Sequence, residues 1–200
     1  METNGPREII TAMKKLASLL VFLTLGLPAL GAEWQLVKED SSLTFSGLQL
    51  GQGFDGRIEE FSASICFDES DLDGAEVVLD INLTSITTGI ADRDEILAAE
   101  EWLDTARYPK AEINIRGVNR IGPNSYVAEA EITIKGTTQV MPLSFTLNLI
   151  ENTAQGEVTI DRRDFKIGDG EWGKSEKWVG FPITIGFHFS AQMTERNCHE

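Results

Sequence analysis

The sequence predicts an all-β protein: a closed barrel of eight antiparallel strands with one short helix between the third and fourth strands. Residues 34–193 contain eight runs in which apolar and polar residues alternate, as expected for strands with one buried face. Short turn sequences separate most of these runs, which favours antiparallel neighbours. An even number of strands also allows a sheet to close without an open edge.

The eight expected strands share this alternation and are bounded by glycine, proline, asparagine or aspartate. They are Trp34–Leu50, Arg57–Phe67, Ala75–Ile86, Ala111–Ile121, Tyr126–Lys135, Met141–Ile150, Gly156–Arg163 and Phe181–Gln192.

Three of the strands carry clear apolar stripes on one face. The stripes are Phe181, Ile183, Ile185, Phe187 and Phe189 in the last strand, Met141, Leu143, Phe145, Leu147 and Leu149 in the sixth, and Val77, Leu79, Ile81 and Leu83 in the third. They contain no charged residue, so the shared interior is apolar. Alternation shows which face is buried but not whether the middle is full, so a packed core and a ligand-sized cavity both stay open.

The one long connection, residues 90–109, predicts a helix. Asp92, Asp94 and Glu95 supply an acidic first turn, which suits the positive end of a helix dipole. We expect Ile96, Leu97, Trp102 and Leu103 to form its apolar side, and the helix to end before Pro109. Such a helix would pack over one mouth of the barrel or along its side.

The N-terminus resembles an export signal. Lys14 and Lys15 precede an uncharged stretch, residues 16–30, that ends on small residues. This stretch is shorter than the roughly twenty residues that span a bilayer, so we expect cleavage and no membrane insertion afterwards. Met13 is an alternative start. We therefore divide the chain into an extension and signal peptide (1–31), a barrel domain (32–194) and a tail (195–200).

The net charge of -15 at pH 7 limits the partners. Such a surface repels phosphate backbones and anionic headgroups, which argues against nucleic acid and against stable docking on an anionic membrane. The acidity either serves solubility or attracts a basic partner.

The two cysteines, Cys66 and Cys198, could form a disulfide in an exported protein. The second and last strands end at the same rim with only the first strand between them, a gap of about 10 Å. The chain after Met193 is long enough to cross that gap. Two free thiols, or one thiol in a disordered tail, are the alternatives.

Few residues suggest chemistry. The only histidines are His188 and His199, and no metal-ligand cluster is visible. Asp161 and Asp164 flank two arginines and suggest either acid–base catalysis or simple charge pairing at a strand end. The sequence contains neither a serine elbow nor a phosphate loop.

Several motifs, in order, resemble the YceI family of bacterial periplasmic proteins, which bind polyisoprenoids. They are Trp34–Leu36, Ser42–Phe45, Phe54–Gly56, Ser85–Thr88, Arg93–Leu97, Glu101–Asp104, Tyr108–Pro109, Ile132–Thr138 and Asp161–Gly168. Two positions depart from the pattern: Ile96 stands where the family often has histidine, and Ala99 where serine is common. If that histidine places a polar head group, this chain holds its head group differently.

The resemblance implies an eight-stranded antiparallel lipocalin-like barrel whose apolar tunnel holds an isoprenoid lipid or quinone, without catalysis or another cofactor. On this reading the protein is a periplasmic carrier, monomeric or homodimeric. The expected ligand-binding residues are Leu79, Ile81, Phe145, Leu147, Ile183, Ile185, Phe187 and Phe189, with Trp102 and Tyr108 near an entrance.

Two other functions stay open. The protein could be a non-catalytic partner of a membrane redox enzyme, with the barrel as a scaffold. A hydrolase or isomerase of small apolar substrates would instead need a buried polar pair inside the barrel.

Overall fold

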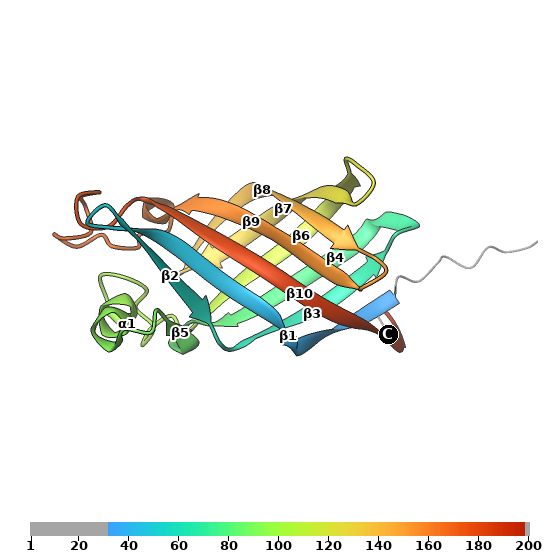
Figure 1. Ribbon diagram of the computed structural model, residues 1–200, viewed down its shortest axis with the longest axis horizontal. Coiled ribbons are helices and arrows are strands. Elements are labelled where there is room, and N and C mark those ends of the chain that lie inside the picture. Colours follow the sequence, from blue (N-terminus) through green and yellow to red (C-terminus); the bar gives the residue numbers. More distant parts are fainter. Residues whose placement is uncertain (1–31, 199–200) are drawn as a thin grey trace, which may run out of the picture.

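A computed structural model describes residues 32–198, which form one closed antiparallel sheet (Figure 1). The strands are β1 (Ala32–Gln49), β2 (Gln52–Ile58), β3 (Phe61–Asp68), β4 (Asp71–Asn82), β5 (Ile86–Thr87), β6 (Lys110–Arg120), β7 (Ser125–Ile134), β8 (Thr137–Asn148), β9 (Thr153–Asp161) and β10 (Pro182–Asn197). Pairing of β1 with β10 closes the barrel. The predicted eight-stranded lipocalin-like fold is confirmed.

Ten strand segments occupy eight positions because two positions are interrupted. β2 pairs with the second half of β1, where Leu43 faces Ile58, whereas β3 pairs with its beginning, where Trp34 faces Ile65. The run expected as one strand over Arg57–Phe67 is therefore two strands. Similarly, a 3-10 turn (Leu83–Ser85) separates β4 from β5. Each of these two interrupted strands thus bends but still fills a single position in the eight-stranded barrel.

The expected export signal and N-terminal extension, residues 1–31, and His199 lie outside the described residues. Strand β10 continues to Asn197, so the sheet takes in part of the segment expected as a tail. Cys66 of β3 and Cys198 form a disulfide across β1, with their Cα atoms 5.7 Å apart. Neither thiol is free.

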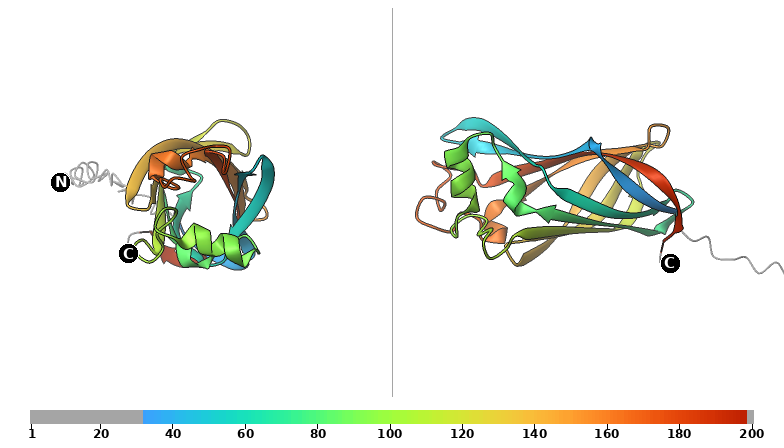
Figure 2. Two further views of the ribbon diagram at one scale, coloured as in Figure 1. Left: turned by 90° about the vertical axis from the view of Figure 1, so that its left-hand side faces the viewer. Right: turned by 90° about the horizontal axis from the view of Figure 1, so that it is seen from below.

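The helix α1 spans Ala91–Ala98 and lies across one end of the barrel (Figure 2). Its first turn is held by Asp94, whose carboxylate accepts hydrogen bonds from both Thr87 and Thr88. Burial would raise the pKa of Asp94, but these hydrogen bonds outweigh it, and the pKa lies below its usual value.

The prediction that Ile96, Leu97, Trp102 and Leu103 form the apolar side of one helix is wrong in part. α1 ends at Ala98, because the chain turns back there: the N–H groups of Trp102 and Asp104 both donate to the carbonyl of Ala99. Ile96 is half exposed, whereas the turns carry Trp102 and Leu103 into the core. Burial of these two residues therefore depends on the turns, and not on helical periodicity.

Candidate functional site

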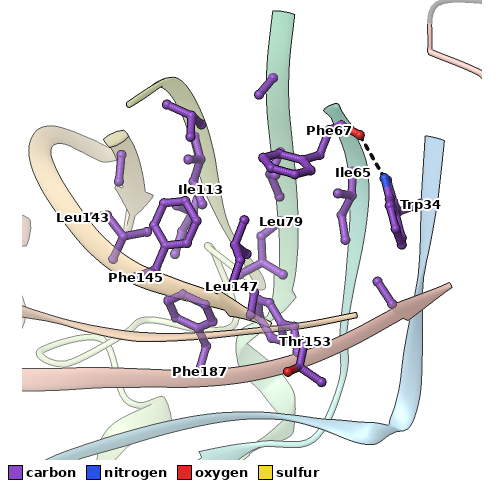
Figure 3. A pocket seen from close by; sticks show the side chains of 18 of the residues that line it. Trp34, Ile65, Phe67, Leu79, Ile113, Leu143, Phe145, Leu147, Thr153 and Phe187 are labelled. Atoms are coloured by element: carbon purple, nitrogen blue, oxygen red, sulfur yellow. Dashed lines mark hydrogen bonds between the residues drawn. The ribbon is translucent and has the colours of Figure 1, made fainter. Parts of the chain in front are cut away.

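An apolar cavity of about 140 Å³ lies inside the barrel (Figure 3). Its wall includes the β8–β9 turn, which lies at the end of the barrel opposite α1 (Figure 1). Every strand except β2 and β5 contributes to its wall. Six of the ten expected ligand-binding residues line it: Leu79, Phe145, Leu147, Ile185, Phe187 and Phe189. The wall also contains Trp34, Leu43, Ile65, Phe67, Ala75, Val77, Ile113, Ile115, Val118, Ala130, Ile132, Leu143, Asn148, Leu149, Asn152, Thr153, Ala154, Val158 and Ala191.

The cavity exists because small inward residues face large ones. Ala75, Ala130, Ala154 and Ala191 contribute wall positions from four different strands. Since each alanine side chain stops at Cβ, these positions leave space that leucine side chains would fill. The interior is thus packed at some levels and open at another.

The end of the barrel beneath α1 is filled by a plug around Arg162. This arginine is 1% exposed, and its guanidinium donates only to main-chain carbonyls. The acceptors are Ile167 (2.7 Å), Gly168 (3.4 Å), Gly173 (2.5 Å), Val179 (2.9 Å) and Gly180 (3.0 Å). Burial lowers the pKa of Arg162 from its usual value. One side chain therefore ties together the loop that follows β9.

Trp102 and Tyr108, which were expected near an entrance, do not line this cavity and belong to the filled end. Trp102 is buried, with the Arg162 guanidinium 5.3 Å from its ring centre. Tyr108 packs beside Gly136, whose Cα could carry no side chain without crowding the tyrosine ring. Ile81 and Ile183 point inward but pack in the core and not against the cavity. The turns after α1 set the positions of Trp102 and Tyr108, whereas Ile81 and Ile183 lie in strands β4 and β10 beyond the reach of the cavity.

The cavity reaches its mouth at the other end, where the β8–β9 turn and, beyond β10, the start of β1 both line it. Trp34 covers one side, and its indole Nε1 donates to the carbonyl of Phe67 at 2.9 Å (Figure 3). The side-chain Oδ1 of Asn148 accepts hydrogen bonds from the main-chain N–H groups of Ile150 and Glu151. Polar groups at the rim are thus largely engaged within the protein.

The wall offers burial and dispersion but no acid–base pair, since none of the lining residues titrates. Asp161, one of the two carboxylates considered for catalysis, lies outside the cavity wall and is hydrogen-bonded to Arg163, which lowers its pKa. Within residues 32–198, no cluster of acidic, histidine or cysteine side chains is suited to hold a metal ion. In the same range, no helix has the length and apolar character to cross a membrane.

Most wall residues outside the three stripes escaped the sequence analysis, among them Trp34, Ile65 and Ile113. The same period-two alternation marks them in β1, β3 and β6, so the signal was present but not used. The alternation could not show that the alanines leave space for a cavity, because it shows which way a side chain points and not how much volume the interior leaves empty. Ile96, one of the two departures from the family pattern, does not line the cavity.

Comparisons with known proteins agree with this architecture. The model of the YceI-like domain matches residues 34–191. Protein YceI of Escherichia coli is 29% identical over 122 residues, 60% of this chain and 63% of that protein. A protein described as UPF0312 from Shewanella denitrificans is 29% identical over 50% of this chain and 52% of its own length. The matches thus span somewhat less than two thirds of these relatives.

Two solved structures extend the comparison to the fold. The crystal structure of Burkholderia cenocepacia BcnA superposes with a TM-score of 0.73 at 25% identity, covering 77% of this chain and 98% of that one. A polyisoprenoid binding domain from Saccharophagus degradans superposes with a TM-score of 0.62 at 17% identity, covering 82% and 99%. With the family model matching nearly the whole barrel, the chain belongs to the YceI-like domain family.

Proposed function

We propose that this protein is a periplasmic carrier that holds the apolar tail of an isoprenoid lipid or quinone inside the barrel. The observation that carries the proposal is the uncharged cavity with its mouth opposite α1. Burial of hydrocarbon contributes about 0.8 kcal/mol per methylene. Several isoprene units could therefore bind tightly without specific polar contacts.

The size of the cavity limits what enters without rearrangement. Its volume of about 140 Å³ resembles that of an engineered apolar cavity of about 150 Å³ that binds benzene. An isoprene unit has five carbons, so one terminal unit fits the cavity as it stands. A longer tail requires the rings of Phe145, Phe187 and Phe189 to change rotamer, and we expect the tail to enter first.

The family supports this ligand class. The domain from Saccharophagus degradans, which shares the fold, is described as polyisoprenoid-binding. The export-signal pattern in residues 13–32, the disulfide and the bacterial relatives support a periplasmic location. No catalytic role is proposed, because the wall holds no titratable side chain.

The test is mass spectrometry of an organic extract of the protein, purified after expression with its N-terminal segment. We expect one isoprenoid per barrel, together with a mature N-terminus near residue 32. A lipid-free protein that also fails to bind added farnesol, a three-unit isoprenoid alcohol, would overturn the proposal. Farnesol binding can be followed by the fluorescence of Trp34 in the cavity wall.

A second candidate is the role of partner to a membrane redox protein, and one observation favours it. Trp172 and Trp178, 59% and 38% exposed, form an edge-to-face pair near Leu48 and Leu50 at the filled end. Exposed tryptophans are common anchors of protein interfaces. A photo-crosslinking residue at position 172 should then capture one defined protein in cells, and the same residue at position 140 should not.

A further inference from the structure

Two hairpin tips at the cavity mouth expose large aliphatic side chains. Ile150, in the β8–β9 turn, is 95% exposed, and Ile121, after β6, is 64% exposed. The tips are neighbours, because the N–H of Leu147 donates to the carbonyl of Asn124 at 2.9 Å. Both lie at the end of the barrel opposite α1 (Figure 1). The mouth is therefore edged by apolar groups in contact with water.

Leu149 connects this edge to the interior. It is 40% exposed beside Ile150, and it also lines the cavity. An apolar surface thus continues from the outermost point of the turn into the barrel. A hydrocarbon chain moving along this path would stay in contact with apolar side chains throughout.

Charge around the mouth disfavours an anionic surface. Glu151 adjoins Ile150, Glu69 lies in the β3–β4 turn, and Asp71 begins β4. Two arginines at this end are already engaged: Arg120 is bound to Glu69 and to the hydroxyl of Tyr126, and Arg196 is paired with Glu33. Like charges repel, so the tips suit an uncharged or zwitterionic surface.

The shape of the edge favours lipid over protein. Protein interfaces rely on tryptophan, tyrosine and arginine anchors in pockets, whereas these two narrow turns carry large aliphatic groups and no aromatic residue or arginine. Aliphatic groups on projecting turns can enter the boundary between headgroups and acyl chains. We propose that the mouth docks on a zwitterionic lipid bilayer through Ile121, Leu149 and Ile150, so that an isoprenoid passes between bilayer and cavity. This inference rests on the proposed function.

The experiment is sedimentation of the protein with phosphatidylcholine vesicles. We expect Ile150→Asp to lower the bound fraction at least about fivefold, because a charge replaces the aliphatic group that would enter the bilayer. Ile121→Asp should act in the same direction. Val140→Asp is the matched control, since Val140 is 54% exposed on β8, well away from the turn, and its binding should not change. Vesicles that contain phosphatidylglycerol should bind less protein.

A second measurement separates docking from cargo binding. Ile150→Asp should bind farnesol in solution within about twofold of the unmodified protein, because Ile150 does not line the cavity. Failure of the unmodified protein to bind farnesol would overturn the proposed function. The docking inference is overturned if the unmodified protein does not sediment with vesicles, if Ile150→Asp has no effect, or if binding is instead lost in Trp172→Ser at the opposite end.

Discussion

Gly156 of β9 lies directly opposite Phe187 of β10 in the inner wall, and the missing side chain makes room for the phenylalanine ring. A Cβ at Gly156 would lie 2.7 Å from the main-chain oxygen of Ser144 and 3.0 Å from Cε1 of Phe187. The main chain of Ser144 cannot yield easily, and the ring of Phe187 must shift as well.

Gly156→Ala should therefore destabilise the protein by about 1–3 kcal/mol and weaken farnesol binding. Thermal unfolding should show a decrease in Tm of about 2–4 °C per kcal/mol. Gly186→Ala is the control: Gly186 faces outward, and its added Cβ would meet only the movable hydroxyl of Thr44, at 3.1 Å. Equal effects of the two substitutions would contradict this account.

Ala130 gives the second prediction, because it is buried and lines the cavity. Ala130→Leu adds three carbons where space exists, so stability should change by less than about 1.5 kcal/mol, while farnesol affinity falls at least about tenfold. Ala128 lies on the same face of β7 but outside the cavity wall. Ala128→Leu should instead overpack the core and cost about 1–3 kcal/mol. Urea unfolding and fluorescence titration distinguish the two; unchanged farnesol affinity in Ala130→Leu would count against the cavity as the binding site.

The sequence predicted the barrel and the inward faces well, because one physical rule governs both. Alternation in β8 and β10 placed Leu147 and Phe187 inside, since each strand must turn its apolar face to the same interior. Alternation depends only on neighbouring residues in the chain. It therefore predicts the inward face correctly even where the second strand of the barrel is divided into β2 and β3, between Ile58 and Phe61.

The ends of the barrel could not be predicted in the same way. The position of Trp102 depends on turns after Ala98 and on contact with Arg162, which is 60 residues later in the chain. In the sequence, Arg162 and Arg163 stand between Asp161 and Asp164, which indicated charge pairing. Nothing in the local sequence showed that Arg162 would be buried among main-chain carbonyl groups. Such contacts arise only once the sheet has closed.

The third prediction concerns this buried arginine. Arg162→Met removes the donor to five main-chain carbonyls, and each acceptor left buried and unpaired costs about 1–3 kcal/mol. We expect a loss of at least about 3 kcal/mol in urea unfolding, with disorder in the loop after β9. Arg163→Met, at an exposed ion pair with Asp161, should cost less than about 1 kcal/mol. Similar losses for both would show that Arg162 does not organise the loop.

The fourth prediction follows from Asp94, whose pKa is lowered in the folded protein. A carboxylate with a depressed pKa contributes stability above its unfolded pKa of about 3.9 and loses that contribution as the pH falls through its folded pKa. Asp94→Asn should therefore cost about 1–2 kcal/mol at pH 7, and its stability should converge with that of the unmodified protein as the pH falls through the lowered folded pKa of Asp94. Asp92→Asn, on the exposed side of the same turn, should cost less than about 0.5 kcal/mol. A pH-independent difference for Asp94→Asn would contradict the assignment.

The fifth prediction concerns the disulfide between Cys66 and Cys198, which are separated by 132 residues. Closing so long a loop restricts the unfolded chain, and this effect is worth about 3–5 kcal/mol in the chain-entropy description. Cys66→Ser should lower the free energy of unfolding by that amount, and Cys198→Ser should match it, because either substitution removes the same bond. Dithiothreitol should bring the unmodified protein to the same value and leave both variants unchanged. If reduction instead altered farnesol affinity with little loss of stability, the bond would act mainly on the mouth, where Ile65, next to Cys66, lines the cavity.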